Sequence, residues 1–350
     1  MPASAAACTA LLFAYFLEQD EALHYAVSRD GLVWSPPLNG GAPVLNCSAS
    51  SLRDPFIARS PAGGFRMVAT NGAGFGGTPT ILTWPSDDLV TWGRETVAAV
   101  MSPAFFPPHA SVANTWAPEW VWDAGAGASG RYLAFWAARG DGIAPALPGP
   151  GCPGNASGRF AFFAAHSDDL IAFDPPFLLF DPGCWATGDG GIDGDLVFDA
   201  ARRMWVLAYK DARGLGEGHA AEELRGIRVV TAPALLGPWT NATTSALLVP
   251  PLVEAPELVM ELPAGAQPGV LLYYDCSFYP TPQGAPRPPY GVARAPSLAE
   301  PYAFTPLPGA CLGNATGDAV VSFPPGATHG SFVCVTEAEL QAVLAAFPEA

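Results

Sequence analysis

Positive charge is scarce in this sequence. Its 350 residues include 16 lysines and arginines against 32 aspartates and glutamates, which gives a formal net charge of -16. Binding to nucleic acid or to an anionic membrane needs a basic surface that displaces counterions. We therefore expect neither of these partners, and a neutral ligand fits the chain better.

A recognisable leader is also lacking. The apolar segment 3–16 has no basic start, is too short to span a bilayer and runs directly into sequence typical of a strand. Four N-glycosylation sequons nevertheless occur, at Asn46, Asn155, Asn241 and Asn314. A leader missing from the sequence would reconcile the two observations, and chance sequons are the alternative. We expect a protein of the secretory pathway.

Cysteine pairs suited to a metal are absent. The seven cysteines form no C-x-x-C pair, and no histidine has the spacing of a zinc site. An exported protein would have one or two disulfides, and Cys152 with Cys184, both in loops rich in glycine and proline, are the pair to test first. The odd total leaves at least one thiol over.

Glycine and proline are abundant, with 38 of each, and half of the residues are apolar. This composition is typical of many short strands around a substantial core. One motif recurs, with a polar start, a turn, a leucine and a closing aromatic residue, in segments 28–34, 86–92, 167–173, 231–239 and 294–302. Five copies at intervals of about 60 to 80 residues indicate a repeat, and a four-stranded propeller blade needs about that length.

A second series of motifs lies between these turns, and each member opens an apolar strand beside proline or glycine. We predict an all-β chain in which residues 1–350 form a single five-bladed β-propeller, with blades starting near 54, 117, 193, 254 and 329. Outer-strand sequence at 11–16 and a lone inner strand at 329 would complete the fifth blade by pairing, which hides the sheet edges. A short helix over 337–347 should follow, with Thr336 as its cap.

Three of the strand starts carry a carboxylate: Asp54, Asp193 and Glu254. The first strand of each propeller blade lines the axis, so these side chains should converge although they are far apart in sequence. Hydrolysis of a glycosidic bond needs one carboxylic acid to protonate the leaving oxygen and one carboxylate to activate water. The predicted convergence is chemically sufficient for that reaction. Asp195 faces the same side of a strand as Asp193 and is an alternative, and Glu257 is a weaker alternative to Glu254.

These strand starts resemble, in order and spacing, those of glycoside hydrolase family 43, and the resemblance covers nearly the whole chain. It rests on Arg53-Asp54-Pro55-Phe56, Trp116-Ala117-Pro118-Glu119, Ile192-Asp193-Gly194, Glu254-Ala255-Pro256-Glu257 and His329-Gly330-Ser331. The resemblance implies a general base at Asp54, an orienting carboxylate that tunes the acid at Asp193, and a general acid at Glu254. It further implies an exo-acting, inverting glycosidase for α-L-arabinofuranosides or β-D-xylosides of a plant or algal polysaccharide.

Further residues are expected to bind the oligosaccharide or polysaccharide substrate. Arg53 would hold a sugar hydroxyl or orient Asp54, Trp116 would stack on a sugar ring, and Glu119 belongs to the same motif as Trp116. Lys210, the only lysine, matches a Lys-Asp pair of the resembling branch. His329 matches a histidine that lies near bound calcium or water in relatives, so the expectation is no required cofactor, with a structural calcium allowed.

Two other functions are alternatives for this sequence. A fructan hydrolase of the same architecture has an asparagine where Arg53 stands and a Glu-Cys acid motif that this chain lacks, which argues against fructan. The other alternative is a carbohydrate-binding propeller that has lost turnover. A segment around Asp275, where the branch has an Asp-His pair, departs from the resemblance and leaves the choice of sugar open.

Overall fold

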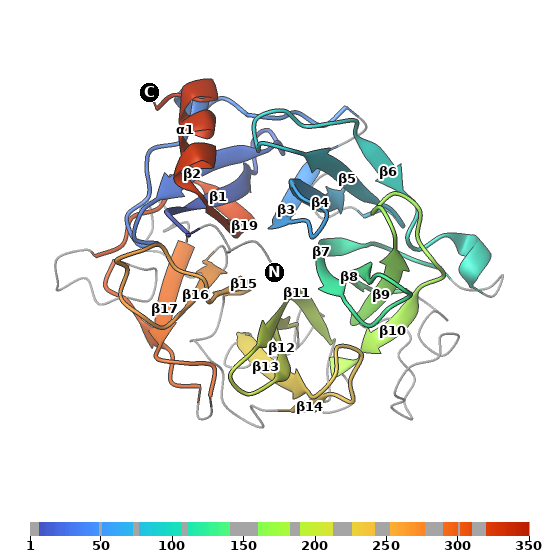
Figure 1. Ribbon diagram of the computed structural model, residues 1–350. Helices are drawn as coiled ribbons and strands as arrows, with labels where there is room; N and C mark the ends of the chain where they lie inside the picture. Colours follow the sequence, from blue (N-terminus) through green and yellow to red (C-terminus); the bar gives the residue numbers. More distant parts are fainter. Residues whose placement is uncertain are drawn as a thin grey trace, which may run out of the picture.

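The computed structural model describes residues 7–48, 51–72, 77–106, 111–140, 160–182, 190–212, 226–241, 253–276, 290–299, 302–309 and 320–349. Within these ranges the chain forms five antiparallel sheets arranged as a ring, with one α-helix at the edge (Figure 1). The predicted all-β, five-bladed propeller with a C-terminal helix is confirmed.

The blades follow one another along the chain, and the innermost strand is the first strand in blades 1 to 4 and β19 in blade 5 (Figure 1). Blade 1 is β3 (Leu52–Arg59), β4 (Phe65–Asn71), β5 (Ile81–Ser86) and β6 (Thr96–Ala98). Blade 2 is β7 (Trp116–Asp123), β8 (Arg131–Ala138), β9 (Ala161–Ser167) and β10 (Phe177–Phe180). Blade 3 is β11 (Gly191–Asp199), β12 (Met204–Asp211), β13 (Ile227–Ala232) and β14 (Thr240–Asn241).

Blade 4 is β15 (Glu254–Val259), β16 (Val270–Asp275), β17 (Tyr290–Ala295) and β18 (Thr305–Pro306). Blade 5 joins the two ends of the chain, with β1 (Ala10–Leu17) between β19 (Ala327–Val335) and β2 (His24–Ser28). Every residue of β1 is buried, because this strand is the middle one of the closing sheet. The predicted pairing of the two ends is confirmed.

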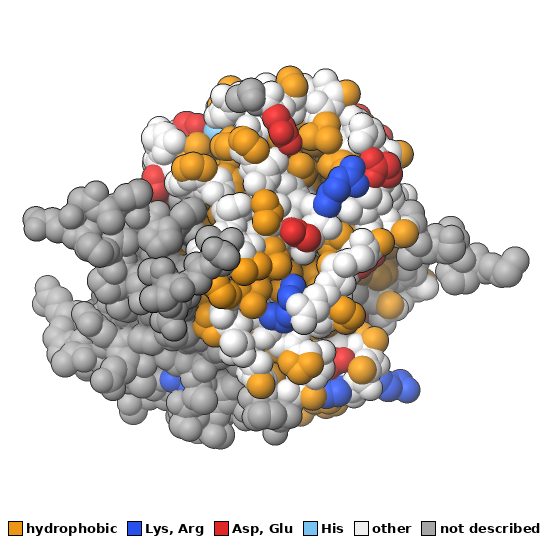
Figure 2. All heavy atoms as spheres, turned by 90° about the vertical axis from the view of Figure 1, so that its left-hand side faces the viewer, with side chains coloured by type: hydrophobic (Ala, Val, Ile, Leu, Met, Phe, Trp, Pro, Cys, Tyr) orange, Lys and Arg blue, Asp and Glu red, His pale blue; other side chains and the backbone are white. Residues whose placement is uncertain are grey.

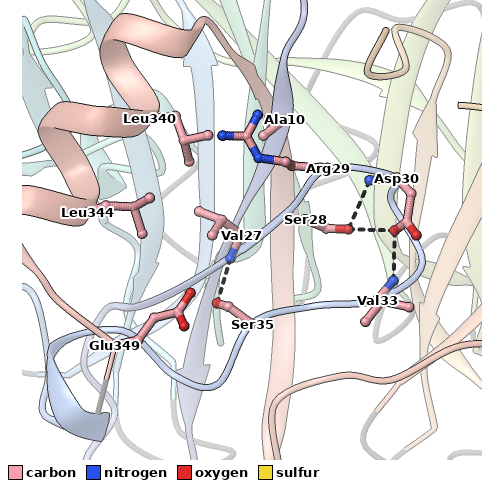
Figure 3. Close-up of a pocket in the computed structure, with 10 residues that line it drawn as sticks. All are labelled: Ala10, Val27, Ser28, Arg29, Asp30, Val33, Ser35, Leu340, Leu344 and Glu349. Carbon is pink, nitrogen blue, oxygen red and sulfur yellow. Dashed lines mark hydrogen bonds between the residues drawn. The ribbon is translucent and has the colours of Figure 1, made fainter. Parts of the chain in front are cut away.

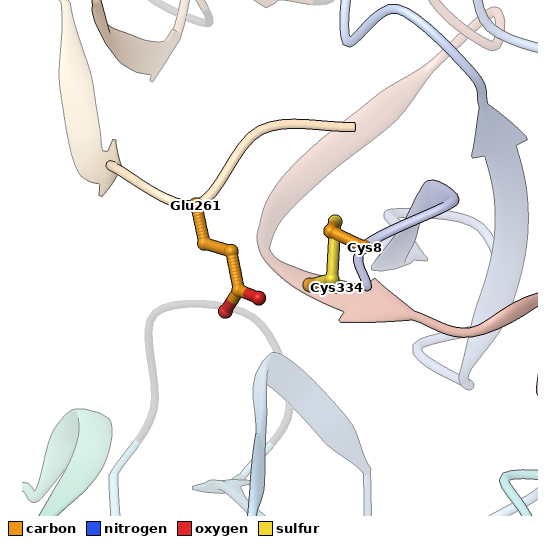
Figure 4. A group of neighbouring side chains, drawn as sticks. All are labelled: Cys8, Glu261 and Cys334. Carbon is orange, nitrogen blue, oxygen red and sulfur yellow. A yellow bond between two sulfur atoms is a disulfide. The ribbon is translucent and has the colours of Figure 1, made fainter. Parts of the chain in front are cut away.

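A disulfide adds a covalent bond to this closure. Cys8, just before β1, is bonded to Cys334 near the end of β19, and their Cα atoms are 5.4 Å apart (Figure 4). The predicted pair of Cys152 and Cys184 lies outside the described residues. The sequence did not single out Cys8 and Cys334, although the predicted pairing of their two strands could have suggested them.

The helix α1 (Glu337–Ala346) begins as predicted. The Thr336 hydroxyl accepts a bond from the Glu339 backbone N–H, and the Glu339 carboxylate accepts one from the Thr336 N–H, so the capping box is complete. Leu340 and Val343 are buried against the core, and Arg59 of β3 donates to Glu339 at 2.7 Å. The helix thereby packs on the outside of the ring closure (Figure 1).

The first three copies of the repeated turn share one set of hydrogen bonds. In the copy at 86–92, Asp88 Oδ1 accepts from the backbone N–H groups of Val90 and Thr91 at 2.9 and 2.7 Å, and Ser86 Oγ accepts from Leu89 N. Asp30 and Asp169 accept equivalent pairs of bonds. These aspartates therefore serve as structural acceptors at the outer ends of the blades.

Two features of the described residues bear on binding partners. On the face drawn in Figure 2, basic side chains lie among acidic and apolar ones. No helix in the described ranges is both long and apolar enough to cross a bilayer.

Candidate active site

A β-bulge near the start of each inner strand builds the site. The pairing registers shift between Arg53 and Phe56 in β3 and at the corresponding places in β7, β11, β15 and β19. In four of the strands the bulged residue has a positive φ, between 43° and 51°, and these residues are Asp54, Ala117, Asp193 and Ala255. A bulge turns a side chain out of the regular alternation of a strand. In β19 the equivalent residue is His329, which with Gly330 lies opposite Tyr15.

Glu254 occupies a different register from the two aspartates. It pairs with Asp275 before the bulge of β15, just as Arg53 pairs with Thr70 in β3, and Ala255 takes the bulged place. Sequence analysis placed Glu254 at the position equivalent to Asp54 and Asp193. The pairing register shows instead that Glu254 lies one residue earlier in its strand. The longer glutamate side chain still brings its charge to the others, because Glu254 acts electrostatically on both Asp193 and His329.

Asp54 is held by two donors from different blades. Thr70 of β4 donates from its hydroxyl to Asp54 Oδ2 at 2.6 Å, and His329 Nδ1 of β19 lies 3.3 Å from Oδ1. Burial favours the neutral acid, but His329, Arg53 and Thr70 together hold the pKa of Asp54 below its ordinary value. Asp54 is thus a carboxylate that stays ionised, which suits a base.

The remaining charges of the site come from blades 3 and 4. Lys210 of β12 donates to Glu254 Oε2, and Asp193 Oδ2 accepts from the Ala255 backbone N–H at 3.3 Å. Burial raises the pKa of Asp193 to about 6, and Glu254 adds to the rise while His329 and Lys210 oppose it. Burial alone would lower the pKa of His329, but Asp54, Asp193 and Glu254 raise it to about 10, so this imidazole carries a proton at neutral pH.

The structure therefore brings five predicted site residues together: Asp54, Asp193, Glu254, Lys210 and His329. Arg53 lies beside them, but its guanidinium donates to Glu21 at 2.8 Å and to Glu18 at 3.0 Å on the β1–β2 connection. Trp116 is partly exposed and stacks on Phe160 with ring centroids 5.2 Å apart.

Glu119 belongs to a second cluster, two residues further along each inner strand. The carboxylates of Glu119, Asp195 and Glu257 are buried, and their donor atoms all lie within 4.8 Å of one another. Burial raises the pKa of Asp195 to about 7 and those of Glu119 and Glu257 well above their ordinary values. Sequence reasoning did not assemble this cluster, because Glu119 and Asp195 lie two residues after the predicted starts at 117 and 193, whereas Glu257 lies three after the predicted start at 254. The three align only in the register, where Ala255 and not Glu254 takes the bulged place.

Oxygen ligands of this kind suit calcium, which takes carboxylates at short range. The three carboxylates of Glu119, Asp195 and Glu257 are thus better suited to an ion than His329, whose Nδ1 faces Asp54. Cys8, Cys334 and Glu261 also lie close together, but both sulfurs are used in the disulfide (Figure 4).

A separate pocket of about 380 Å³ lies away from the axis, between α1 and blade 5 (Figure 3). Leu340 and Leu344 of α1 and Val27 of β2 form its apolar side, and Arg29 and Glu349 lie at its edge. None of the predicted site residues lines this pocket. The predicted acid and base lie in the axial cluster and not in this pocket.

Comparisons with known proteins identify the family of the chain. A family model described as a probable glycosyl hydrolase domain, related to glycoside hydrolase family 43, matches residues 6–259. The chain belongs to this family. This family-43-related chain is accordingly a glycosidase, as its axial carboxylates had indicated. No curated protein sequence matches it.

Solved structures show the same fold. A thermostable family-43 glycoside hydrolase is 15% identical with a TM-score of 0.52, and the match covers 82% of this chain and 80% of that one. A family-43 protein from Bacillus licheniformis is 11% identical with a TM-score of 0.55, covering 91% of this chain but 55% of that one. An endo-1,4-beta-xylanase from Bacteroides thetaiotaomicron is 11% identical with a TM-score of 0.53, covering 81% and 85%. At these identities the likeness shows the fold.

Proposed function

We propose that this glycosidase removes terminal α-L-arabinofuranosyl or β-D-xylosyl residues from a polysaccharide, with inversion at the anomeric carbon. The observation that carries the proposal is the convergence of Asp54, Asp193 and Glu254 from three blades on one axial site. The xylanase named among the similar folds is consistent with a pentose substrate.

The proposed reaction is a single displacement. Glu254 gives its proton to the leaving oxygen while the glycosidic C–O bond breaks, and Asp54 takes a proton from the water whose oxygen bonds to the anomeric carbon. Afterwards Asp54 is protonated and Glu254 is ionised, and exchange with solvent restores both. The environments favour this division, because His329 and Thr70 keep Asp54 ionised before the reaction.

Asp193 has an orienting role in this proposal. It lies on blade 3, next to the blade of Glu254, and its carboxylate is anchored by the N–H of Ala255, the residue next to Glu254. We expect Asp54 and Glu254 to face each other across the axis with a carboxyl separation in the inverting range of about 6.5 to 9.5 Å.

The test is a screen of 4-nitrophenyl pentosides against wild type, Asp54→Asn and Glu254→Gln. We expect Asp54→Asn to lower kcat by about 10²- to 10⁴-fold on every substrate. Glu254→Gln should retain more activity on nitrophenyl substrates than on alkyl glycosides, because nitrophenolate leaves without protonation. Asp168→Asn serves as the control, since Asp168 is 80% exposed at the far end of blade 2.

Proton NMR of the first-formed sugar separates the mechanisms. A product of inverted configuration supports the proposal, whereas retention would mean that a carboxylate acts as nucleophile and that these roles are wrong. A wild-type protein that binds the sugars but turns none of them over would instead indicate a carbohydrate-binding propeller.

A further inference from the structure

Thr70 lies behind the proposed base and is 2% exposed. It stands on β4, the second strand of blade 1, and sequence analysis gave it no role. Its Oγ1 accepts a hydrogen bond from the backbone N–H of Ala117 in blade 2 at 2.8 Å. The same oxygen lies 2.6 Å from Asp54 Oδ2.

These two bonds fix the direction of the hydroxyl. A threonine hydroxyl has one proton to give, and the amide of Ala117 can only donate. The Thr70 proton therefore points at Asp54 Oδ2, while the amide fills a lone pair on Thr70. Ala117 is the bulged residue of β7 in blade 2. Its backbone N–H therefore orients the Thr70 hydroxyl, which in turn orients the Asp54 carboxylate of blade 1.

The opposite oxygen of Asp54 is oriented from the neighbouring blade 5. His329 Nδ1 of blade 5 lies 3.3 Å from Oδ1. The carboxylate is consequently gripped at both oxygens, by groups from two different strands, and its plane cannot turn freely. A base that must aim one lone pair at a water depends on such orientation, and a displacement of about 1 Å can cost about 10²-fold in rate.

Residues at the same register of other second strands make matching contacts. Thr70, Lys210 and Asp275 each pair with the residue just before the bulge in blades 1, 3 and 4. Lys210 reaches Glu254 in the next blade, and Asp275 accepts from the His329 N–H in the next blade at 3.0 Å. Thr70 thus belongs to a repeated set of second-strand residues that support the axial ring across blade boundaries.

We propose that Thr70 is a positioning residue for the general base, fixing the orientation of the Asp54 carboxylate through its hydroxyl. The inference rests on the proposed function of Asp54 and goes beyond it by assigning the group that aims this base. Its action is on turnover and not on sugar binding, because Thr70 contacts Asp54 and not the space in front of it.

The experiment compares Thr70→Val, which keeps the shape but loses the hydroxyl, with Thr70→Ser, which keeps the hydroxyl. Thr70→Val should lower kcat by about 10- to 100-fold with KM changed less than about twofold, and Thr70→Ser should stay within about threefold of wild type. Thr70→Ala is the second variant, with the same expectation as Thr70→Val, should the valine variant fail to fold.

The matched control is Thr115→Val at the same junction between blades 1 and 2. Thr115 is fully buried, and its hydroxyl oxygen lies 2.9 and 2.7 Å from the carbonyl oxygens of Thr78 and Thr80, to which its one proton is directed, away from Asp54. We expect a lower Tm with unchanged kcat. Equal losses of kcat in Thr70→Val and Thr115→Val would overturn the inference, because both would then reflect a loosened junction.

A double variant separates this inference from the proposed function. On an Asp54→Asn background, Thr70→Val should cause no further loss of kcat, since the group that it aims is gone. If Asp54→Asn is inactive and Thr70→Val is fully active, the inference on Thr70 alone is wrong. If Asp54→Asn is active, or wild type hydrolyses no pentoside, the proposed function fails and the inference fails with it.

Discussion

At the outer ends of the blades, Asp30, Asp88 and Asp169 each accept two backbone N–H bonds, and these bonds help to hold their pKa values below the ordinary range. At the axis, Asp193 and Asp195 are buried among other carboxylates, and burial raises their pKa values to about 6 and 7. The same residue type is thus held as an anion at the rim, whereas burial opposes the ionisation of Asp193 and Asp195 at the axis. Asp54 is the exception at the axis, because His329, Arg53 and Thr70 keep it ionised. The rim aspartates support the turn, whereas the protonation of the axial aspartates is set by burial and by the neighbouring charges.

The two regions also repeat in different ways. The rim turns repeat both the backbone bonds and the side chains that make them, as Ser86 with Asp88 and Ser167 with Asp169 show. The axial bulges repeat the backbone, but the side chain changes from blade to blade, in the order Asp54, Ala117, Asp193, Ala255 and His329. Asp54, Asp193 and His329 of the site stand at these bulges, and Glu254 stands one residue before the bulge of β15.

The largest effect among tests of this contrast is expected from Lys210 at the axis. Lys210 is 2% exposed and donates to Glu254, so Lys210→Met leaves the proposed acid without its charged partner. We expect kcat on alkyl pentosides, whose leaving group needs protonation, to fall by about 10²-fold, together with a lower Tm. Arg228→Met is the matched control, because it breaks the equally buried Arg228–Asp211 pair one strand further out. A loss of kcat as large in the control would mean that general destabilisation, and not the axial site, explains the result.

Asp195 tests the difference in pKa between the aspartates at the rim and those at the axis. Its folded pKa of about 7 lies above its ordinary value of 3.8, so between these pH values the folded protein keeps a proton that the unfolded chain has released. Stability must then fall as pH rises through that window. Asp195→Asn is neutral at every pH and should raise Tm at pH 8 with little change at pH 4, measured by calorimetry in a chelator so that no cation replaces the proton. A lower Tm at pH 8 would show that the Asp195 anion is stabilising.

The smallest effect is expected at the rim. Asp88→Ala removes the acceptor of two backbone N–H groups and should cost about 1 kcal/mol of unfolding free energy at pH 7, with kcat unchanged. Because the folded pKa of Asp88 is depressed, this contribution is present above about pH 4 and is lost as pH falls through the folded pKa. Chemical denaturation at pH 7 and pH 2.5 measures both values. A loss of kcat without a loss of stability would contradict the assignment of Asp88 to the fold and of catalysis to the axis.

The parts of the fold that could be predicted are those encoded in short segments. The turn at 86–92 carries its serine, aspartate and aromatic residue within seven positions, and the strand starts at Asp54 and His329 are equally local. Their number and spacing sufficed for five blades and for the pairing of the two ends.

The site was predicted less completely because its details depend on register between strands. The offset of Glu254 follows from its pairing with Asp275, and the role of Thr70 follows from a bond across 16 residues to Asp54 and 47 residues to Ala117. Arg53 was expected to hold sugar, and its ion pairs with Glu18 and Glu21 span more than 30 residues. That it contacts a sugar stays a prediction.

The bond between Cys8 and Cys334 changes the topology of the molecule. It joins residues 326 positions apart, so nearly the whole chain becomes one closed covalent loop that passes once through every blade. In such a loop no blade is first or last. A single cut in any connection between blades therefore leaves all five blades in one covalent molecule. The cross-linked chain also gains fewer conformations on unfolding than a linear chain does.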